Sequence, residues 1–119
     1  NKNITISSTG GGGGDSYTSN GSLLTSSTTS NQVLDSFDST QYRTVKYIVQ
    51  LSSNNKYHSI EIMLIHDGTT PSLVQYAEIF TFEKLGVFTA NLTNNNIQLI
   101  CTPNNDSTKI QVQRQYITI

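Results

Sequence analysis

Apolar and polar residues alternate with a period of two through most of the chain from Asn31 onward. Such alternation is typical of β-strands that bury one face of a sheet, because successive side chains point to opposite sides. In the clearest stretch, 42–52, the apolar residues of one face are Val45, Tyr47, Val49 and Leu51. Seven runs show this pattern, and we expect a strand in each of them: 33–37, 42–52, 57–66, 72–82, 86–92, 96–102 and 109–119.

Turn-forming residues separate these runs. Asn54-Asn55, "TNNN" at 93–96 and "TPNNDS" at 102–107 are rich in asparagine, which adopts positive φ at low cost. No segment keeps an apolar period of 3.6 residues, so helix should be nearly absent. About seven strands with hairpin-length breaks predict an all-β fold. We expect an antiparallel β-sandwich, jelly-roll or immunoglobulin-like, rather than a closed barrel.

The run at 72–82 carries large side chains on both of its faces. Leu73, Ala77 and Ile79 occupy one face, and the other holds Val74, Tyr76, Phe80 and Phe82. The pattern therefore leaves open which face of this strand points inward.

Residues 1–30 are rich in Gly, Ser and Thr and contain the glycine run Gly10–Gly14. Glycine does not restrain the backbone, so this run predicts a flexible connector, and no Gly-Lys-Ser/Thr follows to make a phosphate loop. The alternating "NITIS" at 3–7 could add one short strand. We expect an N-terminal arm or linker at 1–30 and a β-sandwich domain at 31–119. Because the chain starts at Asn1, we expect a segment of a longer polypeptide, or its processed or ordered part.

The composition makes the surface polar without making it charged. Of 119 residues, 34% are hydrophobic and 13% are charged, which favours an extracellular or particle-surface β protein over a cytosolic helical enzyme. The net charge is −1 and the seven basic residues form no run, so we expect no nucleic-acid binding. The longest run of large apolar side chains, 62–65, is too short to span a membrane. Cys101, the lone cysteine, lies in an alternating run and should be a buried, unreactive thiol.

Titratable side chains crowd the stretch "IMLIHDGTTPSLVQYAE" at 62–78. If residues 57–66 are extended, His58 and His66 share a face but lie about 26 Å apart at ~3.3 Å per residue, too far to bind one zinc ion. Glu61, just before the stretch, points to the opposite face. Hairpin pairing sets Glu78 near residues 59–60, remote from His66. These groups should therefore disperse once the strands form.

Asp67-Gly68 is a strong turn dipeptide, so His66 and Asp67 predict a hairpin turn rather than an active site. No Ser, Cys or Lys has a nucleophile's context, and no paired carboxylates suggest a glycosidase. We predict no enzyme and no catalytic, cofactor-binding or metal-binding residue. Tyr47, Tyr57 and Tyr76 alternate with polar residues, and we expect them to pack at the rim of the core rather than to form sugar-stacking platforms.

Five sequence elements follow one another across residues 31–108: "VLDSF", "YRTVKYIVQ", "YHSIEIMLIHDGTT", "YAEIFT" and "NIQLICTPNND". In order and spacing, this series resembles a β-rich domain of the virion structural proteins of tailed phages, especially marine T4-like cyanophages. The resemblance implies a structural module on a tail, baseplate, neck or fibre-type appendage, and it brings no catalytic residue. The glycine-rich N-terminus lies outside the match.

The resemblance implies a virion structural protein that serves assembly or display. Its expected partners are other virion proteins and copies of itself, a trimer being expected from the resemblance alone. The alternative is a receptor- or glycan-binding tip domain with a host surface glycan as partner. Exposed aromatic side chains clustered at one end of the sandwich would favour that alternative. A third hypothesis, a depolymerase-like hydrolase, requires two carboxylates, or a histidine and a carboxylate, within reach of one substrate.

Overall fold

The computed structural model describes residues 2–7, 16–24, 31–105 and 107–119, with side chains described from residue 31 onward. These ranges form nine strands: β1 (Lys2–Ser7), β2 (Ser16–Leu24), β3 (Gln32–Asp38), β4 (Tyr42–Ser53), β5 (Lys56–His66), β6 (Pro71–Phe80), β7 (Gly86–Thr93), β8 (Asn96–Pro103) and β9 (Lys109–Thr118). Within them, no helix has the length and apolar character needed to cross a membrane.

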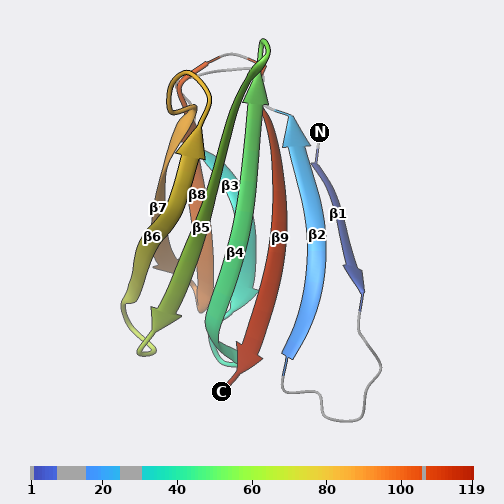
Figure 1. Cartoon of the computed structure of the whole chain (residues 1–119). Coiled ribbons are helices and arrows are strands. Elements are labelled where there is room, and N and C mark those ends of the chain that lie inside the picture. The colour runs from blue at the N-terminus through green and yellow to red at the C-terminus, as the bar shows by residue number, and fades with distance from the viewer. Residues whose placement is uncertain (1, 8–15, 25–30, 106) are drawn as a thin grey trace.

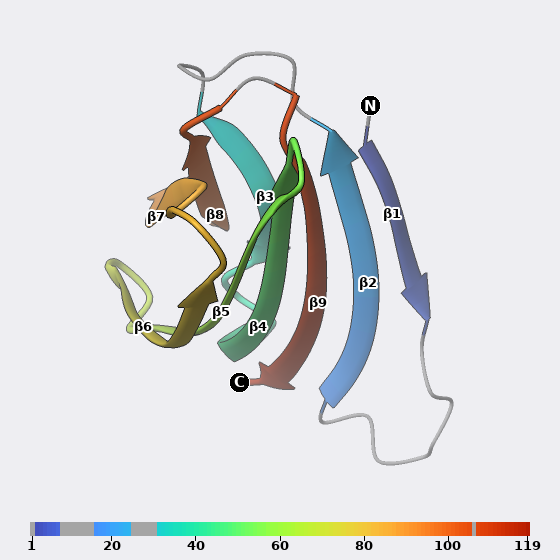
Figure 2. The same cartoon turned by 45° about the horizontal axis from the view of Figure 1, so that its top comes forward.

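Two antiparallel sheets face each other in this fold (Figure 1). The larger sheet has the strand order β1-β2-β9-β4-β5-β6, and the smaller sheet has the order β3-β8-β7. Strands β3 to β9 correspond to the seven runs expected from the alternation, so the all-β antiparallel sandwich is confirmed. Figure 2 shows β1 at the far edge of the larger sheet, beyond β2 and β9.

The core lies between the two sheets and uses the faces that the alternation marked. Cys101 is fully buried, as expected, and burial raises the pKa of its thiol to about 12, which disfavours the reactive thiolate. The buried apolar side chains are Leu34, Phe37, Val45, Tyr47, Val49, Leu51, Ile60, Ile62, Leu64, Leu85, Phe88, Ile97, Leu99, Cys101, Ile110, Val112 and Tyr116.

Two of the expected asparagine turns close two-residue hairpins. Asn54 and Asn55 join β4 to β5 with φ angles of 50° and 65°, and the pair Asn94 and Asn95 joins β7 to β8 with φ angles of 51° and 66°. Positive φ at both central residues matches the right-handed twist of the flanking strands, and asparagine tolerates it better than most residues. These hairpins therefore fix the register of β4 with β5 and of β7 with β8.

The N-terminal residues contribute two strands to the larger sheet, where the sequence suggested at most one. The optional strand at 3–7 is present as β1, but β2 was not expected because it lacks apolar alternation. β2 pairs along its whole length with β9 and also with β1. Backbone pairing does not require a particular side-chain pattern, which is why alternation misses such a strand. Gly10–Gly14 lies outside the described residues, and a domain division at residue 30 stays a prediction.

A β-bulge explains why both faces of β6 carry large side chains. Val74 and Tyr76 lie opposite Met63 and Glu61 of β5, on the outer face of the sheet. The register then shifts at Ala77, whose φ is 51°, and Ile79 lies opposite Ser59 on that same outer face. The extra residue moves the second half of the strand out of phase with the first. The side chains of Glu78 and Phe80 consequently point toward the inner face of the sheet.

The turn between β5 and β6 is built on Asp67, as expected. One carboxylate oxygen of Asp67 accepts hydrogen bonds from the amides of Thr69 and Thr70 at 2.9 and 2.8 Å and from the Thr69 hydroxyl at 2.9 Å. Gly68 follows with a φ of 98°, in the left-handed region that glycine tolerates. The amide bonds from Thr69 and Thr70, which favour the ionised form, lower the pKa of Asp67 to about 2.

A buried carboxylate connects the two sheets. Asp35 of β3 accepts a hydrogen bond from Nη1 of Arg114 at 2.6 Å and another from the Tyr47 hydroxyl at 2.8 Å. The Tyr116 hydroxyl donates to the same carboxylate. Burial, reinforced by the Asp35 carboxylate, raises the pKa of Tyr47 well above its usual range, so the phenol remains a donor. Strand β3 is thus tied to β4 and β9 through one side chain.

Replacing Asp35 with Asn should lower the free energy of unfolding by about 3 kcal/mol, because it leaves the Arg114 charge buried and uncompensated. Urea denaturation followed by circular dichroism measures the change. Tyr47→Phe is the matched control: it removes one donor but keeps the ion pair, and should cost about 1 kcal/mol. Equal stability of Asp35→Asn and the parent chain would contradict the role assigned to this cluster.

Replacing Asp67 with Ala should lower the urea midpoint at neutral pH, since the turn loses its acceptor for Thr69 and Thr70. The folded-state pKa of about 2 lies below the unfolded value near 3.9, so the contribution of the charge is fully present above pH ~4 and is lost as the pH falls toward 2. The difference between Asp67→Ala and the parent should shrink over that window. Asp67→Asn keeps an uncharged acceptor, so it should be more stable than Asp67→Ala by an amount that does not change with pH, whereas a pH-independent difference between Asp67→Ala and the parent would refute the assignment.

Candidate functional site

His66 is a structural residue at the end of β5. Its side chain is buried, its Nδ1 accepts a hydrogen bond from the Gly68 amide at 3.0 Å, and its Nε2 lies 2.6 Å from the Tyr42 carbonyl oxygen. These partners require a neutral imidazole with its proton on Nε2. Both ring nitrogens are therefore used within the fold, and His66 is not positioned for catalysis.

His58 lies at the other end of the same inward face and pairs with Glu78. Its Nε2 is 2.7 Å from a Glu78 carboxylate oxygen, and its Nδ1 accepts the Leu85 amide at 3.1 Å. Burial raises the pKa of Glu78, but the hydrogen bonds from His58 and Lys84 outweigh it and hold the value below the ordinary one. The sequence placed Glu78 near residues 59–60 and did not anticipate this contact, because the bulge at Ala77 turns the carboxylate inward.

The remaining candidates stay apart, as the sequence predicted. Glu61 points outward and forms an ion pair with Lys46, with 3.4 Å between nitrogen and oxygen. Asp67 sits in its turn, so the structure brings together only His58 and Glu78 of the five groups considered. Over residues 31–105 and 107–119, no three His, Cys, Asp or Glu side chains are arranged to hold a metal ion.

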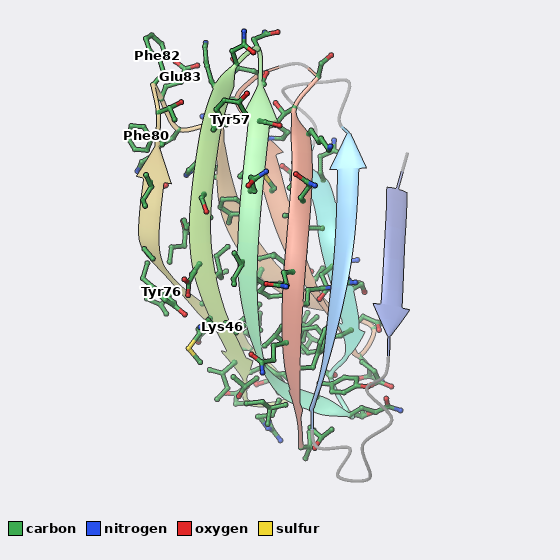
Figure 3. The ribbon with its side chains drawn as sticks, turned by 45° about the vertical axis from the view of Figure 1, so that its right-hand side comes forward. Lys46, Tyr57, Tyr76, Phe80, Phe82 and Glu83 are labelled. Carbon is green, nitrogen blue, oxygen red and sulfur yellow. The ribbon has the colours of Figure 1, made fainter. Side chains whose placement is uncertain are left out.

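Aromatic and aliphatic side chains are exposed at one end of β5 and β6, with Tyr57 and Ile79 on the outer face of the larger sheet, Phe80 at its edge and Phe82 just beyond β6. We call this cluster the aromatic end: Tyr57, Ile79, Phe80 and Phe82, exposed by 49%, 70%, 42% and 72% respectively. Figure 3 shows Tyr57, Phe80 and Phe82 at the same end of the sandwich. Tyr57 was expected to pack at the rim of the core, and its half-exposed ring is a correction. Tyr47 is a second correction, because it is fully buried.

A hollow of about 410 Å³ lies within the aromatic end. Its apolar walls come from Tyr57, Ile79 and Phe80, and its remaining lining from Gln50, His58, Ser59 and Thr81. Thr81 is held in place by two bonds with Tyr57: its amide donates to the Tyr57 carbonyl at 2.9 Å, and its hydroxyl oxygen accepts the Tyr57 amide at 3.0 Å. The lining of the hollow thus combines apolar and polar residues, and hydrogen bonds hold the backbone at Tyr57 and Thr81 in place.

Charged side chains near the hollow pair with one another. Lys56 binds Glu83 at 3.1 Å and lies 5.1 Å from the centre of the Phe82 ring, a cation–π arrangement. Lys84 binds Glu78 at 3.4 Å. The lining itself contains no carboxylate and no ammonium group. It therefore offers rings, an amide and hydroxyls rather than a net charge.

The opposite end of β5 and β6 has a different character. A second hollow of about 300 Å³ is lined by Met63, Leu64, Ile65, Leu73 and Val74, with Thr44 and Ser72. We call it the apolar end. Exposed apolar side chains that gather in this way mark contact surfaces for other macromolecules.

Three exposed glutamines line the outer face of β9, the strand next to β4, and we call them the glutamine row: Gln111, Gln113 and Gln115. Gln50 of β4 lies opposite Gln111, and its Nε2 donates to the Gln111 Oε1 at 3.0 Å. The aromatic end thus borders a row of side-chain amides.

Three of these features were not predicted from the sequence: the aromatic end, the glutamine row and the buried Asp35 cluster. Signals for two of them were present in the sequence. Arg114 falls between Val112 and Tyr116 at an inward position, and an inward arginine implies a buried acid. The two-faced pattern of 72–82 was the signature of the bulge that brings Ile79 to the outer face.

No family model matches the chain, and no curated protein matches it in sequence. Two solved structures have a similar fold. One is a tailspike protein of Acinetobacter baumannii phage AM24, with a TM-score of 0.52 and 9% identity over 86% of this chain and 25% of the tailspike. The other is tailspike gp49 of the A. baumannii phage Fri1, a capsular polysaccharide depolymerase, with a TM-score of 0.52 and 11% identity over 99% of this chain and 20% of gp49.

This chain therefore spans only a quarter and a fifth of the lengths of these two proteins. At 9% and 11% identity, the likeness concerns the fold and not the activity of the whole tailspikes. The comparisons show that the chain has a β-sandwich fold similar to a part of phage tailspike proteins.

Proposed function

We propose that this chain is a structural β-sandwich module of a tailed-phage tail appendage, located in the virion and serving assembly or display. The observation that carries the proposal is the fold shared with part of two phage tailspikes. The sequence elements at 31–108 add the finer assignment to the virion proteins of marine T4-like cyanophages. A polar surface with few charges supports it as well, since contacts made without charges depend little on ionic strength.

We propose further that the module itself is not an enzyme. The one histidine–carboxylate pair among the five candidates, His58 with Glu78, uses both imidazole nitrogens in bonds within the fold. A general base needs a free nitrogen within reach of substrate. The depolymerase activity named for gp49 belongs to a protein of which this chain covers 20%.

Particle reconstruction at side-chain resolution, on the phage that encodes this chain, tests the proposal. The expected result is density for the sandwich on a tail, neck, baseplate or fibre. Mass spectrometry of purified particles, with infected-cell lysate as the control, provides a second readout. Finding the chain in the lysate but never in purified particles would overturn the proposal.

The proposed partners are other virion proteins and copies of the chain, as a homo-oligomer for which we propose three copies. The apolar end supports self-association, because Met63, Ile65 and Val74 are exposed by 41%, 50% and 56%. Apolar side chains gathered on a sheet face lose contact with water when a second copy covers them.

Replacing Val74 with Lys should weaken self-association at least about tenfold, because it puts an unpaired charge into the buried contact. Size-exclusion chromatography with light scattering across a concentration series measures the change. Gln113→Lys, a charge added to the same outer face but away from the apolar end, is the matched control and should have little effect. A monomeric parent chain at all concentrations, or an unchanged Val74→Lys oligomer, would refute self-association through this surface.

A second candidate function is binding of a receptor or a host surface glycan. The aromatic end favours it, because three exposed rings gather at one end of the sandwich (Figure 3). Assembly and glycan binding are compatible, since the apolar end and the aromatic end occupy opposite ends of the same two strands.

A further inference from the structure

We propose that the hollow of the aromatic end binds one unit of an uncharged saccharide. This inference rests on the second candidate function and adds the site, the chemical class of ligand and the residues that contact it. A sugar ring has apolar C–H faces and a rim of hydroxyl groups, so its site needs flat apolar walls beside neutral donors and acceptors. The hollow combines both.

The apolar part of the lining comes from Tyr57 and Ile79 on the outer face and from Phe80 at the sheet edge, whose ring lies edge-on to the His58 ring at 6.0 Å. Each is exposed by more than 40%, so a ligand that covers them removes apolar surface from water. Tyr57 has few rotatable bonds, and its backbone is tied to Thr81 by two hydrogen bonds. Little conformational freedom is therefore lost when a sugar ring packs against it.

The polar side chains in and beside the lining keep hydrogen-bonding capacity that the bonds within the fold do not use. The Thr81 hydroxyl oxygen accepts the Tyr57 amide, which leaves its proton to donate. Gln50 donates through Nε2 to Gln111, which leaves the Gln50 Oε1 as an acceptor and the Gln111 Nε2 as a donor. Ser59, exposed in the lining, adds a hydroxyl that both donates and accepts. These groups match the hydroxyls of a sugar.

The absence of charge in the lining selects an uncharged ligand. Lys56, which precedes Tyr57, and Lys84 are already paired with Glu83 and Glu78. A carboxylate on the ligand would lose its hydration without a free cation in the lining to balance it. An uncharged sugar has no such cost.

The mixed lining favours a saccharide over a protein partner. Protein contacts concentrate apolar groups at their centre, which is the character of the apolar end. At the aromatic end, four of the seven lining residues are Gln50, His58, Ser59 and Thr81. A protein covering this hollow would bury their polar groups and would need matching partners for each of them.

The glutamine row indicates the direction of a longer ligand. Gln50 lies on β4, next to β5, and Gln111 lies on β9, next to β4, so the amide pair leads across the strands away from the hollow. Adjacent strands are about 4.8 Å apart, close to the length of one sugar unit. An oligosaccharide anchored against Tyr57 on β5 therefore reaches Gln50 on β4 with its next unit and Gln111 on β9 with the one after it.

The test uses the full 119-residue chain, displayed on streptavidin for valency, on an array of neutral and uronic-acid-containing bacterial oligosaccharides. The expected result is binding to neutral fragments that is insensitive to salt. For a positive fragment, Tyr57→Ala should weaken binding about tenfold, and Gln50→Leu about threefold to tenfold. Ser59→Trp, which fills the hollow from an exposed position, should abolish it.

Val87→Ala, an exposed apolar change on β7 of the smaller sheet, is the matched control and should leave binding unchanged. Thermal unfolding of each variant identifies any that fails to fold. If Tyr57→Ala fails to fold, Ser59→Trp tests the site independently of it. Binding that survives both Tyr57→Ala and Ser59→Trp, binding restricted to acidic fragments, or no binding on the array would each overturn the inference. Presence of the chain in purified particles would uphold the proposed structural role in any of these cases.

Discussion

The sandwich depends on one buried charge, the carboxylate of Asp35. This side chain on the small sheet accepts bonds from Tyr47, Arg114 and Tyr116, which all belong to the large sheet. A carboxylate out of water is tolerated only when donors replace its hydration, so the two sheets are stable in one relative position. Arg114 Nε and Nη2 have no partner among the described groups, which makes the guanidinium depend still more on Asp35. Burial of apolar side chains holds the two sheets together, and the Asp35 cluster favours one position of the sheets relative to each other.

With stability supplied on the inner face, the outer face of β4, β5 and β6 is free to vary. It carries an apolar end, an ion pair of Lys46 with Glu61, and an aromatic end in succession along the strands. The bulge at Ala77 divides the two ends, because it lets β6 present Val74 and Ile79 outward while Glu78 turns in toward His58. Edge strands are commonly interrupted by such bulges, which re-aim side chains. The one extra residue of the bulge thus explains both the inward contact of Glu78 with His58 and the outward exposure of Ile79.

The sequence predicted the strands well because their burial depends on a local period, as at Val45 to Leu51, and the hairpins because asparagine tolerates positive φ at Asn54 and Asn55. It failed where the outcome depends on pairing with distant residues. β2 is a strand by its backbone pairing with β9, without an apolar pattern of its own. Irregular registers, at Ala77 and between Val33 and Asp35, bring Glu78 and Asp35 inward against the simple alternation. The aromatic end was not predicted, because its composition depends on which side of β6 faces solvent.

The similarity to tailspikes at 9% and 11% identity follows from how little a sandwich demands of its sequence. Alternating apolar positions and short turns suffice for the fold, and many different residues satisfy them. The inner face therefore says little about function. The outer side chains are not needed for the core, so a gathering of rings and amides there requires another explanation. Contact with a partner is the explanation that we propose, and the different chemistry of the two ends is consistent with the two partners proposed above, a second copy of the chain and a saccharide.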